Sequence, residues 1–122
     1  MVNLDQQRAA FAWQRVEHAQ EKMREEKYSD YKNLAKGIPA MIINNGLMQT
    51  LAFLHSKGKT HHILLLNDLI QWLHQHLASS KDYQDLMKYL FETDSHQFRQ
   101  ATEESMHMLR WLRQFADTGE TE

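Results

Sequence analysis

The sequence contains no cysteine, one proline and four glycines among its 122 residues. Without cysteine the chain has no disulfide framework, no Cys-ligated zinc site and no cysteine nucleophile, and a reducing cytoplasm is the expected compartment. So few prolines and glycines leave little room for β-turns, and no stretch alternates strictly between apolar and polar residues. We therefore predict an all-α protein.

Long apolar runs are also missing. The longest unbroken aliphatic run, residues 63–66, is far shorter than the ~20 residues that a transmembrane helix needs. Asp5 lies where a secretory leader would be positively charged, and no apolar core follows it, so we expect no signal peptide and no membrane. A hydrophobic content of 42% predicts one soluble domain over residues 1–122, with a frayed tail over about residues 118–122.

Acidic residues are missing from residues 31–67, a segment that carries four lysines although the net charge of the chain is −2. Its most unusual part is the Asn-Asn-Gly sequence of residues 44–46, which separates two apolar runs. We predict two short helices hinged at this corner, the first opened by Pro39 after an earlier helix has ended at Gly37. A cationic segment with amide side chains suits contact with a phosphate backbone.

Charge is distributed unevenly along the chain. Residues 1–62 carry nine Lys/Arg and six Asp/Glu, a net charge of +3, whereas residues 63–122 carry five and ten, a net charge of −5. Oppositely charged halves favour head-to-tail contact between copies, or docking on a partner. An isoelectric point near 6.4 is low for a tight, free-standing nucleic-acid binder, so such a role must be local or shared with partners.

Helical periodicity predicts a compact bundle of about five to seven helices, three of them long. The first long helix is expected from about residue 3 or 4 to residue 27, and the second from its cap at Thr60 to about residue 76 or 77. Asp94 and Gln97 form a predicted capping box for the third. Its apolar residues step by three and four, a bundle seam formed by Phe98, Ala101, Ser105, Met108, Leu112 and Phe115.

Shorter helices are expected between the long ones. Ser29 is a good N-cap for a short helix that ends at Gly37, and the two hinged helices follow it. Ser79 and Ser80 are expected to begin a further short helix over residues 82–91. We find no internal repeat and no interdomain linker.

No motif predicts an active site. The Gly-Lys-Thr sequence of residues 58–60 resembles the end of a phosphate-binding loop, but Phe53 occupies the position of the first glycine. Glu104 and His107 have the spacing of a di-iron bundle motif, whose second copy is missing. No serine lies in a glycine-flanked elbow. We expect a non-enzymatic protein without a metal or another cofactor.

The eight histidines and three tryptophans have ordinary structural explanations. Histidines two residues apart on a helix point to different sides, so surface or interface histidines with satisfied hydrogen bonds are expected rather than metal ligands. Trp13, Trp72 and Trp111 could stack on bases. Each of them lies in or beside an apolar run, so packing in the core or at an interface is the preferred interpretation.

The order of several short blocks resembles a known family. These blocks are Arg-Ala at residues 8–9, Ile-Pro-Ala at 38–40, Asn-Gly-Leu at 45–47, Thr-Leu-Ala-Phe-Leu at 50–54, Ala-Thr-Glu-Glu at 101–104 and Leu-Arg-Trp-Leu-Arg-Gln-Phe-Ala at 109–116. In this order they resemble the small subunit of the type III-B CRISPR effector, the RAMP-module (Cmr) complex. The likeness spans nearly the whole chain, and the block from Pro39 to Leu54 is its most specific part.

This resemblance implies a small, all-helical subunit of an RNA-silencing complex in antiviral defence. Several copies would stack as a minor filament beside larger subunits that hold the guide RNA, and together they would enclose a groove for the target RNA. Cleavage would belong to the neighbouring subunits. Because base pairing with the guide supplies sequence specificity, this subunit is expected to contact only phosphate and sugar of the target strand.

The candidate RNA-binding residues come from the matching block and from the basic pattern. Arg8, Arg15 and Lys22 recur every seven residues and form a row along one edge of the apolar stripe of the first helix. Taken alone, such charges are more typical of a solvated, salt-bridged helix face. The candidate set is Arg8, Arg15, Lys32, Lys36, Asn44, Asn45, Gln49, Lys57 and Lys59.

Two other functions stay open. The first is a helical adaptor whose basic segment binds an acidic protein partner, which salt-sensitive binding in the absence of nucleic acid would favour. The second is a metal-dependent bundle enzyme that uses Glu104 and His107, which stoichiometric iron or manganese in the purified protein would reveal.

Overall fold

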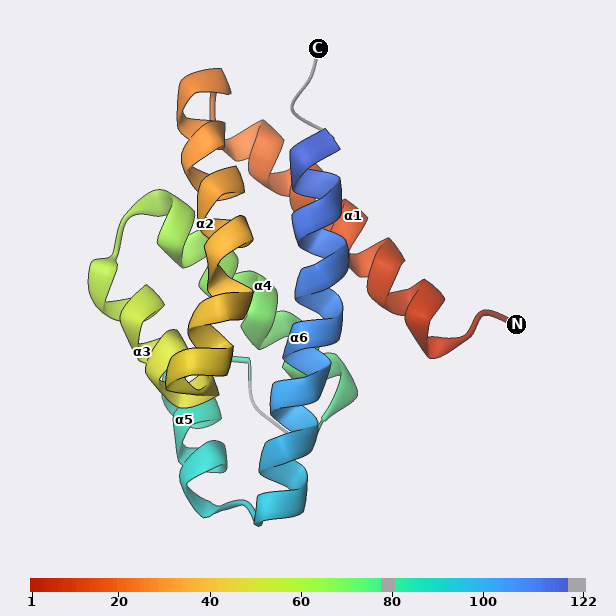
Figure 1. Cartoon of the computed structure of the whole chain (residues 1–122), viewed down its shortest axis with the longest axis vertical. Helices are drawn as coiled ribbons and strands as arrows, with labels where there is room; N and C mark the ends of the chain where they lie inside the picture. The colour runs from red at the N-terminus through yellow and green to blue at the C-terminus, as the bar shows by residue number, and fades with distance from the viewer. Residues whose placement is uncertain (78–80, 119–122) are drawn as a thin grey trace.

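The structure, a computed structural model, describes residues 1–77 and 81–118. Within these residues it contains six helices and no strand, which confirms the all-α prediction (Figure 1). The helices are α1 (Leu4–Lys22), α2 (Glu25–Asn45), α3 (Leu47–Lys57), α4 (Thr60–His76), α5 (Tyr83–Glu92) and α6 (Ser95–Thr118). The predicted helix start at Ser79 and Ser80, and the tail beyond residue 118, lie outside the described residues.

Helix α6 packs against α1, α2 and α4. In Figure 1 it runs antiparallel beside α2, and α1 crosses behind it. The predicted seam lies on the inner side of α6, because steps of three and four residues keep side chains on one side of a helix. Four seam residues are buried, namely Ala101, Ser105, Met108 and Leu112. The other two, Phe98 and Phe115, are partly buried.

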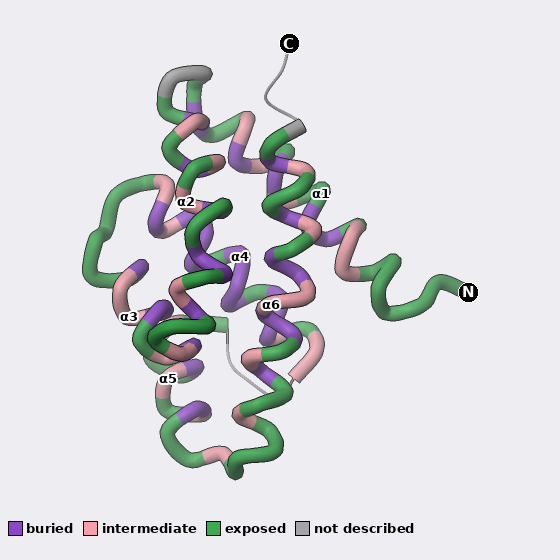
Figure 2. Tube along the Cα trace, viewed as in Figure 1, coloured by how far each residue is buried: buried purple, intermediate pink, exposed green. Residues whose placement is uncertain are grey.

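Helix α4 is the most enclosed element of the bundle. Buried segments lie on the inner sides of the helices in Figure 2, and α4 is buried over most of its length. Its buried residues occur at almost every position from 64 to 73, which is typical of a helix covered on several sides. One of them, Asp68, is a carboxylic acid with an exposed fraction of 1%. A buried acid needs partners, and these come from α1 and α2.

The break between the first two helices lies earlier than predicted. Helix α1 ends at Lys22 rather than Lys27, and Ser29, the predicted cap, lies inside α2. Met23 has an extended backbone and is buried, as is Tyr28, whose hydroxyl donates a hydrogen bond to the Ala116 carbonyl oxygen at 2.9 Å. A straight helix through residue 27 would carry these side chains away from α6, so tertiary packing places the break.

Helix α2 also continues where the sequence predicted an end. Gly37 does not adopt a positive φ, and Pro39 lies inside the helix, so the predicted boundary between two helices was wrong. The reason is an unbroken buried stripe of Ala35, Ile38 and Ile42, whose packing outweighs the hydrogen bond that Pro39 cannot make. The Asn-Asn-Gly corner is confirmed, because α2 ends at Asn45, and Gly46 has a φ of 91° that favours glycine.

The helix caps agree partly with prediction. The Gln97 N–H donates to Asp94 Oδ1 at 2.8 Å, which is one of the two bonds of the predicted capping box, and the Gln97 side chain accepts from the Thr93 hydroxyl. Thr60 was predicted to cap α4, but it is the first residue of that helix, and the N-cap position belongs to Lys59. Over the described residues, we find no helix with the length and apolar character needed to cross a membrane.

Candidate nucleic-acid interface

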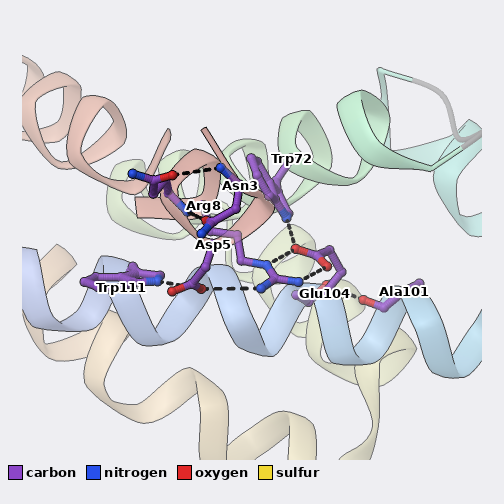
Figure 3. A network of polar contacts seen from close by, with 9 residues as sticks. Asn3, Asp5, Arg8, Trp72, Ala101, Glu104 and Trp111 are labelled. Atoms are coloured by element: carbon purple, nitrogen blue, oxygen red, sulfur yellow. Dashed lines mark hydrogen bonds and ion pairs between the residues drawn. The ribbon is translucent and has the colours of Figure 1, made fainter. Parts of the chain in front are cut away.

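Arg8, the first candidate residue, points into the molecule from α1. Its Nε lies 2.6 Å from Glu104 Oε2, and its Nη2 lies 2.8 Å from Glu104 Oε1 (Figure 3). A third nitrogen, Nη1, lies 3.3 Å from Asp5 Oδ1. The side chain is 14% exposed, and its hydrogen bond with Glu104 raises the pKa of Arg8. The guanidinium is thus bound to two carboxylates of its own chain.

Glu104 also accepts a hydrogen bond from Trp72 on α4, whose Nε1 lies 3.0 Å from Oε2. Burial raises the pKa of Glu104, but hydrogen bonds from Arg8 and Trp72 outweigh burial and hold it below its ordinary value. This carboxylate joins α1, α4 and α6. Glu104 and His107 have the spacing of a di-iron bundle motif. Within the described residues we find no cluster of three or more metal-ligating side chains.

Arg15, the second candidate on α1, bonds to Asp68 on α4. Its Nε lies 2.6 Å from Asp68 Oδ1, and the Tyr31 hydroxyl of α2 donates to Oδ2 at 2.6 Å. Burial raises the pKa of Asp68 to about 7, although both hydrogen bonds act in the opposite direction. Burial, followed by the neighbouring Asp68, raises the pKa of Tyr31. Asp68 therefore joins α1, α2 and α4, and Arg15, like Arg8, is bound to an acid of its own chain.

Two candidate lysines lie on α2. Lys36 is exposed, and its Nζ lies 3.3 Å from Asp117 Oδ1 on α6. Lys32 is half-buried. The pairs of Arg8, Arg15 and Lys36 each join a cation of the positive half of the sequence to an acid of the negative half. Part of the charge asymmetry noted in the sequence is therefore neutralised within the molecule.

The other five candidates are exposed and lie at the two ends of α3. Asn44, Asn45 and Gln49 surround the Gly46 corner, and Lys57 and Lys59 lie at the opposite end. Helix α3 has 11 residues, so about 16 Å separates its ends. Its inner side is anchored in the core by Leu47, Leu51 and Leu54, each with an exposed fraction of 0%. The five side chains thus project from a rigid helical surface.

Aromatic side chains surround the Lys57 end of α3. The Lys57 ammonium lies over the Phe53 ring, 5.6 Å from its centroid, and the His62 ring meets Phe53 edge-on at 5.7 Å. His61 lies 4.2 Å from His62, and His55 stacks on Tyr83 of α5 at 4.0 Å. The contacts of Lys57, Phe53, His62 and His61 form a connected cluster at the α3–α4 corner, and the His55–Tyr83 stack joins α3 to α5.

His62 differs from the predicted surface histidine. Its exposed fraction is 7%, and among the described residues its Nδ1 has no hydrogen-bond partner. Burial lowers the pKa of His62, and the charges of His61, Lys57 and Lys59 lower it further, whereas Asp30 raises it. His62 stands four residues before Leu66 and seven before Leu69, so helical periodicity places it on the buried side of α4, a signal that the interpretation as a surface histidine did not use.

The tryptophans divide between the core and the surface. Trp72 has an exposed fraction of 1%, which confirms core packing, whereas Trp13 is 49% exposed. Trp13 meets Phe115 of α6 edge-on at 5.2 Å, and Trp111 donates from Nε1 to Asp5 Oδ1 at 3.1 Å. Both therefore pack between α1 and α6.

Comparison with known proteins gives consistent matches. The family model described as CRISPR-associated protein (Cas_Cmr5) matches residues 4–119 of this chain. The CRISPR system Cmr subunit Cmr5 of Thermus thermophilus is 33% identical over 105 residues, which are 83% of this chain and 88% of that protein. The subunit of the same name from Thermotoga maritima is 40% identical over 53 residues, 43% of this chain and 41% of that protein.

A solved structure resembles the fold over almost its full length. The X-ray crystal structure of a CRISPR-associated Cmr5 family protein from Thermus thermophilus matches with a TM-score of 0.78 and 30% sequence identity. The match covers 93% of this chain and 97% of that chain.

Proposed function

This chain belongs to the Cas_Cmr5 family of CRISPR-associated proteins, and on that premise we propose that it is a non-catalytic subunit of the type III-B Cmr complex. Further copies of the chain stack with it as a minor filament, beside the subunits that hold the guide RNA. The subunit holds the target RNA by backbone contacts, in antiviral defence in the cytoplasm. The family itself agrees with the resemblance found in the short sequence blocks.

The observation that carries the RNA-binding part is the exposed surface at the two ends of α3. It presents two lysines and three amide side chains from a segment, residues 31–67, without a single Asp or Glu. Lysine contacts a phosphate as a point charge, and amides donate hydrogen bonds to phosphate and sugar oxygens. Such contacts carry no base information, which suits a subunit whose complex reads sequence through its guide.

A non-catalytic role is supported by the partners of the inner carboxylates. Glu104 accepts hydrogen bonds from Arg8 and Trp72, and Asp68 accepts them from Arg15 and Tyr31. Each carboxylate joins three helices and has a side chain that is 11% exposed or less, whereas a general base must reach a substrate. These acids are structural in our proposal.

The RNA contacts are tested by a charge reversal in the assembled complex. A Lys57→Glu/Lys59→Glu variant is compared with Lys88→Glu, which changes an exposed lysine of α5 outside the acid-free segment. We expect weaker target-RNA binding for the double variant alone, with a salt slope lower by about 0.7 for each lost phosphate contact. Lys36 is left unchanged, because a glutamate there would face Asp117. Unchanged affinity with normal assembly would remove both lysines from the RNA path.

The assembly part is tested by purifying the tagged protein from its native cells. Recovery of the other Cmr subunits together with guide RNA supports the proposed complex, and the copy number per complex tests the stacking. Recovery of an acidic protein partner without guide RNA would support the adaptor instead.

A further inference from the structure

The start of α4 has an unusual lack of capping. Lys59 occupies the N-cap position without a side-chain hydrogen bond to the helix, and the first turn contains no acidic residue. The first backbone bond of this turn runs from the Ile63 N–H to the Lys59 carbonyl oxygen at 3.0 Å. By helix geometry, the N–H groups of the residues before Ile63 have no acceptor within the helix. They and the helix dipole favour an anion here.

His62 is a second and independent sign of a missing ligand. It is the third residue of α4, it is more than nine-tenths buried, and among the described residues its Nδ1 has no hydrogen-bond partner. Side chains of a helix lean toward its N-terminus, so this ring leans toward the uncapped turn. Native proteins rarely leave a buried polar atom without a partner, and a bound group is one explanation.

The neighbours of His62 give the expected ligand its charge. Lys57 of α3 lies over the same Phe53 ring that His62 meets edge-on, and Lys59 and His61 adjoin His62 along the chain. The acid that acts on His62 is Asp30 of α2, and its effect is smaller than that of the cations. An anion bound among these groups would favour the protonated ring, which then donates hydrogen bonds.

We propose that the α3–α4 corner, formed by Lys57, Lys59, His62 and the first N–H groups of α4, binds one phosphate group of the RNA and that His62 makes this binding pH-sensitive. The inference rests on the proposed function, because the phosphate belongs to the RNA backbone. In the free protein, burial and the neighbouring cations lower the pKa of His62, and phosphate binding draws a proton from solvent onto its ring. RNA binding therefore tightens as the pH falls.

The first experiment measures the affinity of the full chain for a short oligouridine RNA at constant ionic strength, at about pH 8 and about pH 6. If RNA raises the pKa of His62 by one unit, binding becomes up to about tenfold tighter at the lower pH. His62→Gln should lose this gain while it keeps its affinity at about pH 8. His96→Gln, which changes an exposed histidine of α6, is the matched control and should behave as the unaltered chain does.

The second experiment follows the imidazole C2–H resonance of His62 by NMR in the folded, unaltered chain. We expect its titration midpoint to rise when oligouridine is added. A resonance that moves with inorganic phosphate but not with RNA would mean a site for the free ion, and would overturn the proposal. Lys59→Gln leaves the core untouched and should weaken RNA binding at both pH values, and an unchanged affinity would also contradict the site.

The outcomes separate this inference from the proposed function. If RNA binds and His62→Gln retains the full pH dependence, the His62 site is wrong and the RNA-binding function stands. If the isolated chain does not bind RNA, and changes in this subunit do not alter RNA binding by the assembled complex, the His62 site and the RNA-binding function are both wrong.

Discussion

Two arginines of α1, seven residues apart, make ion pairs of the same chemistry in different surroundings. In the Arg8–Glu104 pair the guanidinium donates a hydrogen bond to each oxygen of the carboxylate, and the Glu104 side chain is 11% exposed. In the Arg15–Asp68 pair a single guanidinium nitrogen meets Asp68, whose side chain is 1% exposed. Each carboxylate has one further donor from another helix, the Trp72 indole or the Tyr31 hydroxyl.

The difference in depth reverses the effect on the two acids. For Glu104 the hydrogen bonds outweigh burial, and its pKa is held below the ordinary value. For Asp68 burial outweighs the hydrogen bonds, and its pKa rises to about 7. In both pairs the arginine favours the charged acid, but for the deeper acid the cost of desolvation is larger than this gain. The two pairs should respond differently to mutation and to pH.

The largest expected effect is that of removing the deeper acid. Asp68→Ala leaves Arg15 Nε and the Tyr31 hydroxyl without their acceptor and should lower the free energy of unfolding by about 3–5 kcal/mol. Glu104→Ala should cost less, about 1–3 kcal/mol, because its partners are closer to solvent. Urea unfolding measures both, with Asp117→Ala as an exposed control that costs at most about 1 kcal/mol. Equal losses of unfolding free energy for Asp68→Ala and Glu104→Ala would mean that the depth of the acid does not determine its contribution to stability.

The pH dependence of stability should identify Asp68. Its carboxyl protonates at 3.8 when unfolded and at about 7 when folded, so between these values the folded state binds more protons. Stability therefore falls as pH rises through this range, by a few kcal/mol at most, on the order of 1.4 kcal/mol per unit. Glu104 acts in the opposite sense, since its contribution is lost only as pH falls below 4.5.

The test is urea unfolding across this pH range, with Asp68→Asn beside the unaltered chain. The variant has no proton to lose at this position and should show a flatter profile. Parallel profiles for the two proteins would show that folding does not raise the pKa of Asp68.

Removing the hydroxyl donor should have a smaller effect. Tyr31→Phe leaves one oxygen of Asp68 without its hydrogen bond, which should cost about 2 kcal/mol and raise the pKa of Asp68 further. Tyr28→Phe is the matched control, because the Tyr28 hydroxyl donates to the backbone carbonyl of Ala116. Both variants should lose stability, but Tyr31→Phe alone should shift the pH profile. A shift in both would point to a general change in packing.

The smallest expected loss of stability comes from replacing the two parallel hydrogen bonds that Arg8 donates to Glu104. Arg8→Lys keeps the positive charge but replaces two parallel hydrogen bonds with one, which should cost about 1 kcal/mol. Arg15→Lys should cost less, because one nitrogen of Arg15 contacts Asp68. Thermal unfolding of both variants gives the ranking, and the reverse order would mean that depth rather than geometry decides the exchange.

Local patterns predicted the parts of the fold that depend on neighbouring residues. The seam of α6 and the Gly46 corner follow from side-chain spacing and from the freedom of glycine, and both were confirmed. The break after Lys22 and the passage of α2 through Pro39 were missed. In both cases buried contacts with other helices outweigh local signals, and such contacts are not visible in a single sequence.

The candidate site shows the same limit. The seven-residue repeat correctly placed Arg8 and Arg15 at the edge of the apolar stripe of α1. Side chains at such an edge can face either solvent or a neighbouring helix. Which of the two occurs depends on Glu104 and Asp68, which lie 96 and 53 residues further along the chain. The exposed positions of Lys57 and Lys59 needed no distant partner, and their segment was recognisable from its missing acids.

These two distances also set the order in which a growing chain can be completed. When α4 has left the ribosome, Arg15 can already bind Asp68, whereas Glu104 has not yet emerged. Until α6 follows, the first half of α1 lacks its partner, and the Arg8 guanidinium stays in water. Helix α1 is therefore synthesised first but completes its tertiary contacts last. The turns around Arg8 should exchange their amide hydrogens freely until synthesis is nearly complete.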